Sequence, residues 1–188
     1  MSELIIRTAS LADRALIRSI AERTWPSTYG HIISQEQISF MLDWMYSDDS
    51  LAEQIVKGHA FYIAGIQKED GTVEEVGFCS VSAEVEDIAN VVEIENSKPN
   101  SSDSPKSHKL NKLYVLPAAQ GTGSGKVLLN KAIEVAKTEG SSSLFLQVNK
   151  HNNAYTFYLK NGFVKEQEFK FDIGNGFYMD DYVMRLHF

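Results

Sequence analysis

The glycine-rich stretch QGTGSGK, residues 120–126, constrains the fold of this chain more than any other feature. It follows the strand-like run KLNKLYVLP and precedes KVLLNKAIEVAK, whose apolar residues recur at helical spacing. Glycine has no Cβ, so the backbone can turn tightly there and direct several N–H groups toward one point. The start of the next helix adds unpaired N–H groups and a partial positive charge. The stretch therefore predicts a strand–loop–helix unit that binds a pyrophosphate, with a ligand-free turn as the alternative.

Two familiar nucleotide-binding loops do not match this stretch. A Walker A loop that ends at Lys126 needs glycine at position 120 and a hydroxyl residue at position 127, but the chain has Gln120 and Val127. The dinucleotide pattern GxGxxG fails from each of the first two glycines, because its last position is not glycine. ATP and NAD are therefore not the expected ligands.

The composition limits the class of protein. The 188 residues suffice for one domain with a sizeable core, and we predict a single domain over 1–188. The net charge of −7 argues against nucleic-acid binding. No run approaches the ~18 apolar residues of a membrane span, and the N-terminus lacks the pattern of a secretion signal. The single cysteine, Cys79, excludes an internal disulfide and a cysteine-cluster metal site. We expect a cytoplasmic protein without metal or membrane association, and a homodimer stays open.

Capping and helix-breaking residues delimit the first part of the chain. Residues 4–9 are predicted to form a strand, and Ser10 then caps an amphipathic helix that Pro26 and Gly30 should end. Two further helices each begin with a capping-box pattern, in the pairs Ser34 with Gln37 and Ser50 with Glu53.

Strand-like runs dominate the remainder. Residues 59–67 and 73–85 are joined by the turn signal KEDG. After the glycine loop and its helix come a strand at 143–149, a helix in NAYTFYLKNG and two strands joined by GNG. The order is β, two or three helices, ββ, βαβα and ββ, which is typical of an α+β fold. Residues 97–107 contain five serines and two prolines, which predicts a mobile loop.

Two motifs together resemble the GNAT superfamily of acyl-CoA N-acyltransferases. VLPAAQGTGSGK matches its Q/R-x-x-G-x-G/A loop through Gln120, Gly123 and Gly125, and LFLQVNKHNNAYTFYLKNGF is similar to its strand followed by Asn, Ala and FY…GF. The resemblance covers about residues 107–165 closely. It implies the GNAT fold, a central mixed and mostly antiparallel sheet flanked by helices. It also implies an N-acetyltransferase that uses acetyl-CoA as co-substrate.

The resemblance assigns the residues that would bind acetyl-CoA. In GNAT enzymes the pyrophosphate rests on the loop, and the preceding strand pairs with the pantetheine arm, where a backbone N–H would also polarise the thioester carbonyl. The corresponding residues are Leu113, Tyr114 and Val115 in the strand and Gln120, Gly121, Thr122, Gly123, Ser124, Gly125 and Lys126 in the loop. Asn152 matches an asparagine that contacts the pantetheine in many relatives. Asn153 is its alternate, and a helix N-cap is the other interpretation of Asn152.

Tyr158 matches the family's tyrosine that protonates the departing thiolate, a step that a phenol within reach can assist. Tyr155, three residues earlier, is the second candidate, and a core tyrosine is the alternative interpretation. The general base stays unassigned, because Gln147 stands where some relatives have glutamate. The sequence leaves open a base at His108, Glu93 or Glu95, a water, or a pocket that selects the neutral amine. Cys79 is too isolated in the sequence to suggest an acyl-cysteine.

The acceptor is predicted from charge and from the first helices. Trp25 and Tyr29 in WPSTYG would offer aromatic faces to a cationic group. Asp180 and Asp181 would attract an amine, although neighbours in a strand face opposite ways and a solvated turn edge is the alternative. Residues 68–103 carry ten Asp and Glu against two Lys. The N-terminal pattern is loosely similar to spermidine/spermine-acetylating GNAT members. We expect a small, cationic amine or polyamine as acceptor; the alternatives are a peptide N-terminal acetyltransferase and a CoA-binding module without turnover.

Overall fold

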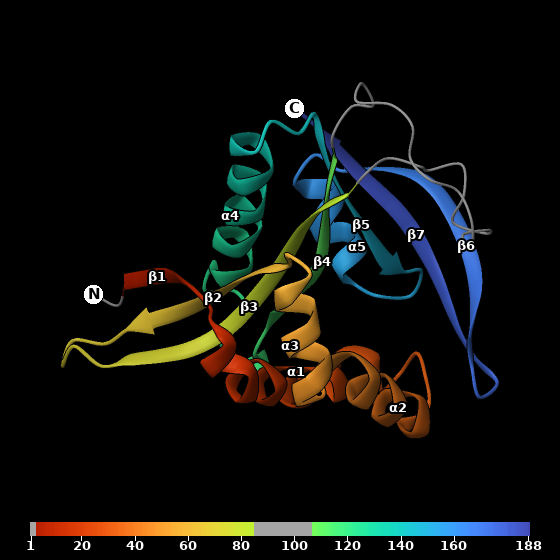
Figure 1. Cartoon of the computed structure of the whole chain (residues 1–188), viewed down its shortest axis with the longest axis horizontal. Helices are drawn as coiled ribbons and strands as arrows, with labels where there is room; N and C mark the ends of the chain where they lie inside the picture. Colours follow the sequence, from red (N-terminus) through yellow and green to blue (C-terminus); the bar gives the residue numbers. More distant parts are fainter. Residues whose placement is uncertain (1–2, 85–106) are drawn as a thin grey trace.

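The computed structural model describes residues 3–84 and 107–188, in which seven strands form one sheet (Figure 1). The strands are β1 (Glu3–Thr8), β2 (Ala60–Gln67), β3 (Val73–Glu84), β4 (Ser107–Val115), β5 (Ser143–Asn149), β6 (Val164–Gly174) and β7 (Phe177–His187). Their spatial order is β1-β2-β3-β4-β5-β7-β6, and every neighbouring pair is antiparallel except β4 with β5. The predicted α+β fold with a mixed, mostly antiparallel sheet is confirmed.

Helices cover the two faces of this sheet. They are α1 (Arg14–Tyr29), α2 (Gln35–Tyr46), α3 (Asp48–Val56), α4 (Ser124–Thr138) and α5 (Ala154–Lys160). On one face, Leu128, Leu129 and Ala132 of α4 join the buried residues of the central strands in one core cluster. On the other face, α1–α3 bury a second cluster that includes Ile17, Ile38 and the rings of the strand residues Phe61 and Phe78. Figure 1 shows α4 apart from the group of α1, α2 and α3.

The first helix continues through Pro26 to Tyr29, and Gly30 is its C-cap. Gly30 therefore ends the helix as predicted, but Pro26 does not. Proline removes one amide donor, and local hydroxyl groups reinforce the same turns. Thr24 Oγ1 donates to the Ile20 carbonyl at 2.7 Å, and Ser27 Oγ donates to the Thr24 carbonyl at 2.9 Å. The burial of Trp25 within the second core cluster also holds this last part of α1 in place. Tertiary packing therefore overrides the helix-breaking signal.

The predicted caps are partly correct. Ser34 caps α2, and its Oγ accepts from the Gln37 amide at 3.1 Å. The side chain of Gln37 does not return to Ser34, because its Nε2 donates to the Tyr178 carbonyl at 2.8 Å. The cap of α3 is Ser47 and not Ser50, since the Ser50 amide donates to Ser47 Oγ at 3.3 Å and the helix begins at Asp48.

A bulge in β4 separates this strand from β5. The parallel pairing of β4 with β5 covers only Ser107–Leu110 against 143–146. The register of β4 against β3 shifts at Ser80/Val81, which leaves Asn111 unpaired. As a result Leu110 and Leu113 both join the α4-side cluster. From Asn111 onward one edge of β4 pairs with β3 and the other edge faces a gap, so the fold opens near the predicted segment KLYV.

Some predictions fall outside the described residues. The predicted mobile loop lies there, except for Ser107, which begins β4. Residues 85–103 of the acidic stretch, with the candidate bases Glu93 and Glu95, lie there as well. Within residues 3–84 and 107–188, no group of three His, Cys, Asp or Glu is placed to bind a metal ion. No helix of that same portion is long and apolar enough to cross a bilayer.

Candidate active site

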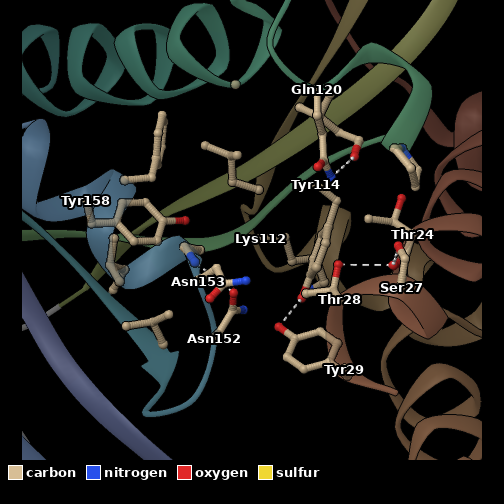
Figure 2. A pocket seen from close by; sticks show the side chains of 18 of the residues that line it. Thr24, Ser27, Thr28, Tyr29, Lys112, Tyr114, Gln120, Asn152, Asn153 and Tyr158 are labelled. Carbon is tan, nitrogen blue, oxygen red and sulfur yellow. Dashed lines mark hydrogen bonds between the residues drawn. The ribbon is translucent and has the colours of Figure 1, made fainter. Parts of the chain in front are cut away.

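A cavity of about 650 Å³ lies where β4 and β5 separate, with walls from α1, β4, the glycine loop, β5 and α5 (Figure 2). The predicted site residues on its lining are Tyr29, Leu113, Tyr114, Val115, Gln120, Gly121, Gly123, Gly125, Lys126, Asn152 and Tyr158. The fold therefore brings the glycine loop and the second motif to one space, although they are separated in the sequence. We call this space the first cavity.

The glycine loop requires left-handed backbone at two positions. Gly121 has φ of +84° and Gly123, the N-cap of α4, has φ of +93°. A Cβ at Gly121 would meet no described atom within 4 Å, and one at Gly123 would lie 3.5 Å from Leu4 Cδ1. Glycine is therefore needed at these positions for backbone conformation and not because space is lacking.

Hydroxyl groups fix the shape of this loop. Thr122 Oγ1 donates to the Ala119 carbonyl at 2.7 Å and lies 2.7 Å from the buried Ser124 Oγ. The Thr122 amide donates to the same Ala119 carbonyl at 3.4 Å, and neither Thr122 nor Ser124 is part of the cavity lining. The first turn of α4 starts at Ser124 and, as in any helix, leaves its first amides without intrahelical partners. Gly121, Gly123, Gly125 and Lys126 line the first cavity, so the loop and the N-terminal turn of α4 border this space.

The unpaired edge of β4 forms one wall of the first cavity. Leu113 and Val115 pack toward α4, whereas Tyr114 turns its ring to the α1 side. Gln120 lies against the end of this strand, where its Nε2 donates to the Val115 carbonyl at 3.4 Å. Lys126 donates from Nζ to Asn161 Oδ1, which ties the start of α4 to the end of α5.

Tyr158 of α5 projects its hydroxyl into the first cavity, on the side opposite Tyr114 and Tyr29 (Figure 2). Its side chain is 7% exposed, and its ring packs against Phe157 and Phe163. Burial raises the pKa of Tyr158 above its ordinary value, so the phenol keeps its proton at neutral pH. Tyr155 instead packs against Tyr182 with ring centroids 5.1 Å apart and does not line the first cavity. Of the two predicted tyrosines, only Tyr158 faces this space.

Asn152 and Asn153 both line the first cavity, next to Tyr158. Asn152 Oδ1 accepts from the Ala154 amide at 2.9 Å, so this residue also stabilises the start of α5. The N-cap of α5 is Asn153, which makes no side-chain cap hydrogen bond, so the N-cap interpretation of Asn152 is wrong. Asn152 lies one residue before the cap and lines the first cavity.

A second cavity of about 380 Å³ lies on the other side of the gap, under α1, α2 and the β6–β7 hairpin. Six residues line both cavities: Tyr29, Leu110, Asn111, Lys112, Tyr114 and Gln147. Most of the other walls are aromatic or methionine side chains, namely Trp25, Met41, Trp44, Met45, Phe169, Phe171, Tyr178 and Met179. Trp25 is only 2% exposed and its ring packs at a tilt against Tyr29, so it supports the wall more than it offers a free face.

Asp180 and Asp181 face opposite ways, as predicted, but only Asp180 lies at a solvated edge. Asp180 Oδ1 pairs with Lys150 Nζ at 2.7 Å. Asp181 is 4% exposed and lines the second cavity. Burial and then the neighbouring Asp180 raise the pKa of Asp181 to about 6. The interpretation of this pair as a solvated turn edge is wrong for Asp181.

Two lysines of β4 also line the second cavity, because the bulge at Asn111 turns both Lys109 and Lys112 to this face. Lys112 Nζ donates to Gln54 Oε1 at 2.6 Å and lies over the ring of Tyr46. Burial, together with Lys109, lowers the pKa of Lys112 to about 8. Burial also lowers the pKa of Lys109, against the opposing effect of Glu84 and Asp181.

Two side chains considered in the sequence analysis, His108 as a base and Cys79 as a nucleophile, lie outside both cavities. His108 lines neither cavity, since its ring lies between Ser141 Oγ at 2.6 Å and Glu139 Oε2 at 3.0 Å on the α4 side. Its prediction as a base is therefore wrong. Cys79 is fully buried, and burial raises the pKa of its thiol to about 12, which agrees with the expectation that no acyl-cysteine forms.

Several lining residues were not predicted from the sequence. From α1, the first cavity receives Thr24, Ser27 and Thr28, and the turn after this helix adds His31. Lys109 and Lys112 line the second cavity without any local motif that marks them, whereas Asp181 belongs to the acidic pair that the sequence had singled out. Helix packing and a bulge determine all these positions, and neither can be read from a short motif.

Comparison with known proteins agrees with this architecture. A family model described as "Acetyltransferase (GNAT) domain" matches residues 32–180. The chain is 28% identical over 166 residues to a spermidine N(1)-acetyltransferase of Thermoplasma acidophilum, covering 86% of this chain and 88% of the relative. The crystal structure of the PaiA N-acetyltransferase of the same organism, in complex with coenzyme A, superimposes with a TM-score of 0.72 at 26% identity and covers 99% of both chains.

A more distant solved structure shares the fold alone. Arabidopsis thaliana NAA60, in complex with a bisubstrate analogue, has a TM-score of 0.71 at 17% identity over 99% of both chains. The match of the family model to most of the sequence, on the predicted sheet and with both motifs at one cavity, establishes the family. The chain belongs to the GNAT family and is an acetyl-CoA-dependent N-acetyltransferase.

Proposed function

We propose that this enzyme transfers the acetyl group to the primary amine of a small acceptor, with acetyl-CoA in the first cavity and the acceptor in the second. The observation that carries the proposal is that the two cavities meet at the gap between β4 and β5 and share one set of walls. An acetyl group that enters from one side can there meet an amine that enters from the other.

The residues present fit acetyl-CoA. The pyrophosphate, with its negative charge, suits the amides of the glycine loop and the N-terminus of α4. The free edge of β4 from Leu113 to Val115 offers backbone groups to the amides of the pantetheine arm. Asn152 and Asn153 add amide side chains at the opposite wall.

Tyr158 is the proposed general acid for the thiolate that leaves. Its raised pKa keeps the buried phenol protonated at neutral pH, so the hydroxyl can donate to the developing thiolate. The amine attacks the acetyl carbon directly, since Cys79 is buried away from both cavities and no covalent enzyme intermediate is invoked.

Among small amines, the second cavity favours a monoamine whose single ammonium group is attached to an apolar alkyl or aryl group. Its walls are mainly aromatic and methionine side chains, which suit an alkyl or aryl group. Among its described residues, one carboxylate, Asp181, faces two lysines, Lys109 and Lys112. Several ammonium groups of a polyamine would meet those lysines at close range, which is unfavourable. The similarity to a spermidine acetyltransferase supports a small amine in general.

Thiol release from acetyl-CoA by the full chain tests this function. The panel is phenylethylamine, spermidine and a short peptide that begins with methionine, and mass spectrometry identifies the acetylated product. We expect release that depends on the amine, with the highest kcat/KM for phenylethylamine. A preference for spermidine would contradict the acceptor class but not the transfer. Binding of acetyl-CoA without release above hydrolysis for any amine would contradict the function and favour a CoA-binding module.

A further inference from the structure

Among the described residues that line the second cavity, Asp181 carries the one carboxylate. It lies on β7, the next-to-last strand of the sheet, opposite Asn149 at the end of β5 and Phe169 of β6. The side chain is 4% exposed, whereas its neighbour Asp180 turns to the surface and pairs with Lys150. Burial of a carboxylate costs free energy unless the charge is paired or hydrogen-bonded, so the position of Asp181 in this cavity requires an explanation.

The groups around Asp181 leave its carboxylate without a fixed cation. Asn149 Oδ1 accepts from the His151 amide at 3.0 Å, so the Asn149 NH₂ group is the part that can hydrogen bond to Asp181. The charged groups that act on it are Asp180 on its own strand, Lys109 on β4 and Lys150 after β5, and it in turn acts on the phenol of Tyr29 on α1. Within the described part of the chain, Asp181 forms no ion pair. An acceptor ammonium can therefore supply the missing cation.

We propose that Asp181 is the catalytic base, the carboxylate that receives the proton of the acceptor amine as this amine attacks the acetyl group. The proposal rests on the proposed function and adds the group that the sequence left unassigned. The bound ammonium first gives one proton to Asp181, which releases it to solvent, and the neutral amine then attacks. As the C–N bond forms and the C–S bond breaks, the second amine proton passes to Asp181 and the thiolate takes a proton from Tyr158, which regains it from solvent. The atoms and charges balance without a further reactant.

The other titratable groups nearby are less suited to this role. Lys109 and Lys112 line the same cavity, but an amine that is protonated repels an acceptor ammonium. Lys112 in addition already donates to Gln54. His108 lies between Ser141 and Glu139, outside both cavities. Gln147 lines both cavities, but an amide does not accept a proton usefully. Burial raises the pKa of Asp181 to about 6, closer to neutrality than an exposed carboxylate and so better matched to a base that works near pH 7.

The experiment compares Asp181→Asn with the matched control Asp180→Asn, using acetyl-CoA and phenylethylamine. The two residues are adjacent, and each substitution exchanges a carboxylate for an amide of the same shape. The readouts are kcat/KM between pH 5 and pH 10, acetyl-CoA affinity by calorimetry, and titration of the aspartate carboxyls by NMR. The last two do not depend on turnover.

In the wild type, kcat/KM should rise up to about pH 6 and then level off, and one carboxyl resonance should titrate in the same range. Asp181→Asn should lose that resonance and about 100-fold in kcat/KM at pH 7. Its kcat/KM should instead rise about tenfold per pH unit toward the pKa of the free alkylammonium, near ~10. Acetyl-CoA affinity should be unchanged. Asp180→Asn should keep the activity of the wild type at pH 7, and its rise in kcat/KM should move to lower pH because a carboxylate that raises the pKa of Asp181 is removed.

Different failures have different meanings. An active wild type with an Asp181→Asn variant that keeps the same pH profile overturns the role of Asp181 alone. A decrease in kcat/KM that is equal at every pH, with a higher KM, also overturns it, because it indicates charge recognition without proton transfer. A wild type that releases no thiol with any amine overturns the proposed function and the base together.

Discussion

The hydroxyl groups of Tyr29 and Tyr114 lie 3.1 Å apart and join helix α1 to strand β4 between the two cavities. Burial raises the pKa of both phenols, so both stay neutral and one donates to the other. Since each tyrosine lines both cavities, this contact fixes the wall between them, past which the acetyl group and the amine meet in the proposed function.

The first prediction is a coupling between these two tyrosines. Tyr29→Phe or Tyr114→Phe alone should lower the free energy of unfolding by ~1–2 kcal/mol, because each leaves the other hydroxyl with one partner fewer. The double variant should cost less than the sum of the single ones, with a coupling energy of ~0.5–1 kcal/mol. Urea denaturation of all four proteins measures the cycle. Strictly additive effects would show that the two hydroxyls do not stabilise each other.

The second prediction tests whether the glycine loop binds acetyl-CoA, with a left-handed glycine outside the loop as the control for backbone strain. Gly121 and Gly140 have φ of +84° and +80°, and at neither position would an added Cβ meet a described atom within 4 Å. Alanine at either position should lower the free energy of unfolding by a similar ~1 kcal/mol. Only Gly121→Ala should raise the Kd of acetyl-CoA, by about tenfold or ~1.4 kcal/mol. Calorimetry on the two variants decides, and equal affinities would remove Gly121 from the binding loop.

The sequence predicted those parts of the molecule that depend on local chemistry. The left-handed glycines, the strand before them and the helix after them follow from a few neighbouring residues, and so does the order of elements. Tyr158 could be chosen from its motif, although only the packing of α5 distinguishes it from Tyr155. The loop and the first cavity were therefore largely predictable.

The acceptor side was not predictable for a physical reason. Lys109 and Lys112 share a face only because a bulge at Asn111 shifts the alternation of β4. Asp181 is buried only because β6, β5 and α1 surround it, and no short pattern encodes that arrangement. The continuation of α1 past Pro26 has the same origin, since core packing around Trp25 outweighs a local preference.

The third prediction concerns the proton of Tyr158. Tyr158→Phe should lower kcat by ~100-fold, because the thiolate loses its acid while the ring still packs against Phe157 and Phe163. The Kd of acetyl-CoA should change little. Tyr155→Phe is the control on the same helix, and it should keep full activity because Tyr155 faces Tyr182. A Tyr158→Phe enzyme with wild-type kcat would assign the proton to another donor.

The last prediction is a dependence of stability on pH that comes from Asp181 and needs no substrate. Its folded pKa of about 6 lies above the ~3.9 of an unfolded aspartate, so between these values the folded chain binds more protons than the unfolded chain. Stability therefore falls as pH rises from about 4 to 6, by ~2–3 kcal/mol for a shift of this size.

Asp181→Asn removes this titration, so the free energy of unfolding of the variant should exceed that of the wild type at pH 7 and approach it near pH 4. Urea denaturation across this range measures the difference, and Asp180→Asn is again the control. Asp180 has its pKa lowered by Lys150, so its contribution has the opposite sign: it is present above the unfolded pKa and lost as pH falls. A difference between wild type and Asp181→Asn that does not change with pH would mean that Asp181 is solvated, and would contradict the buried acceptor site.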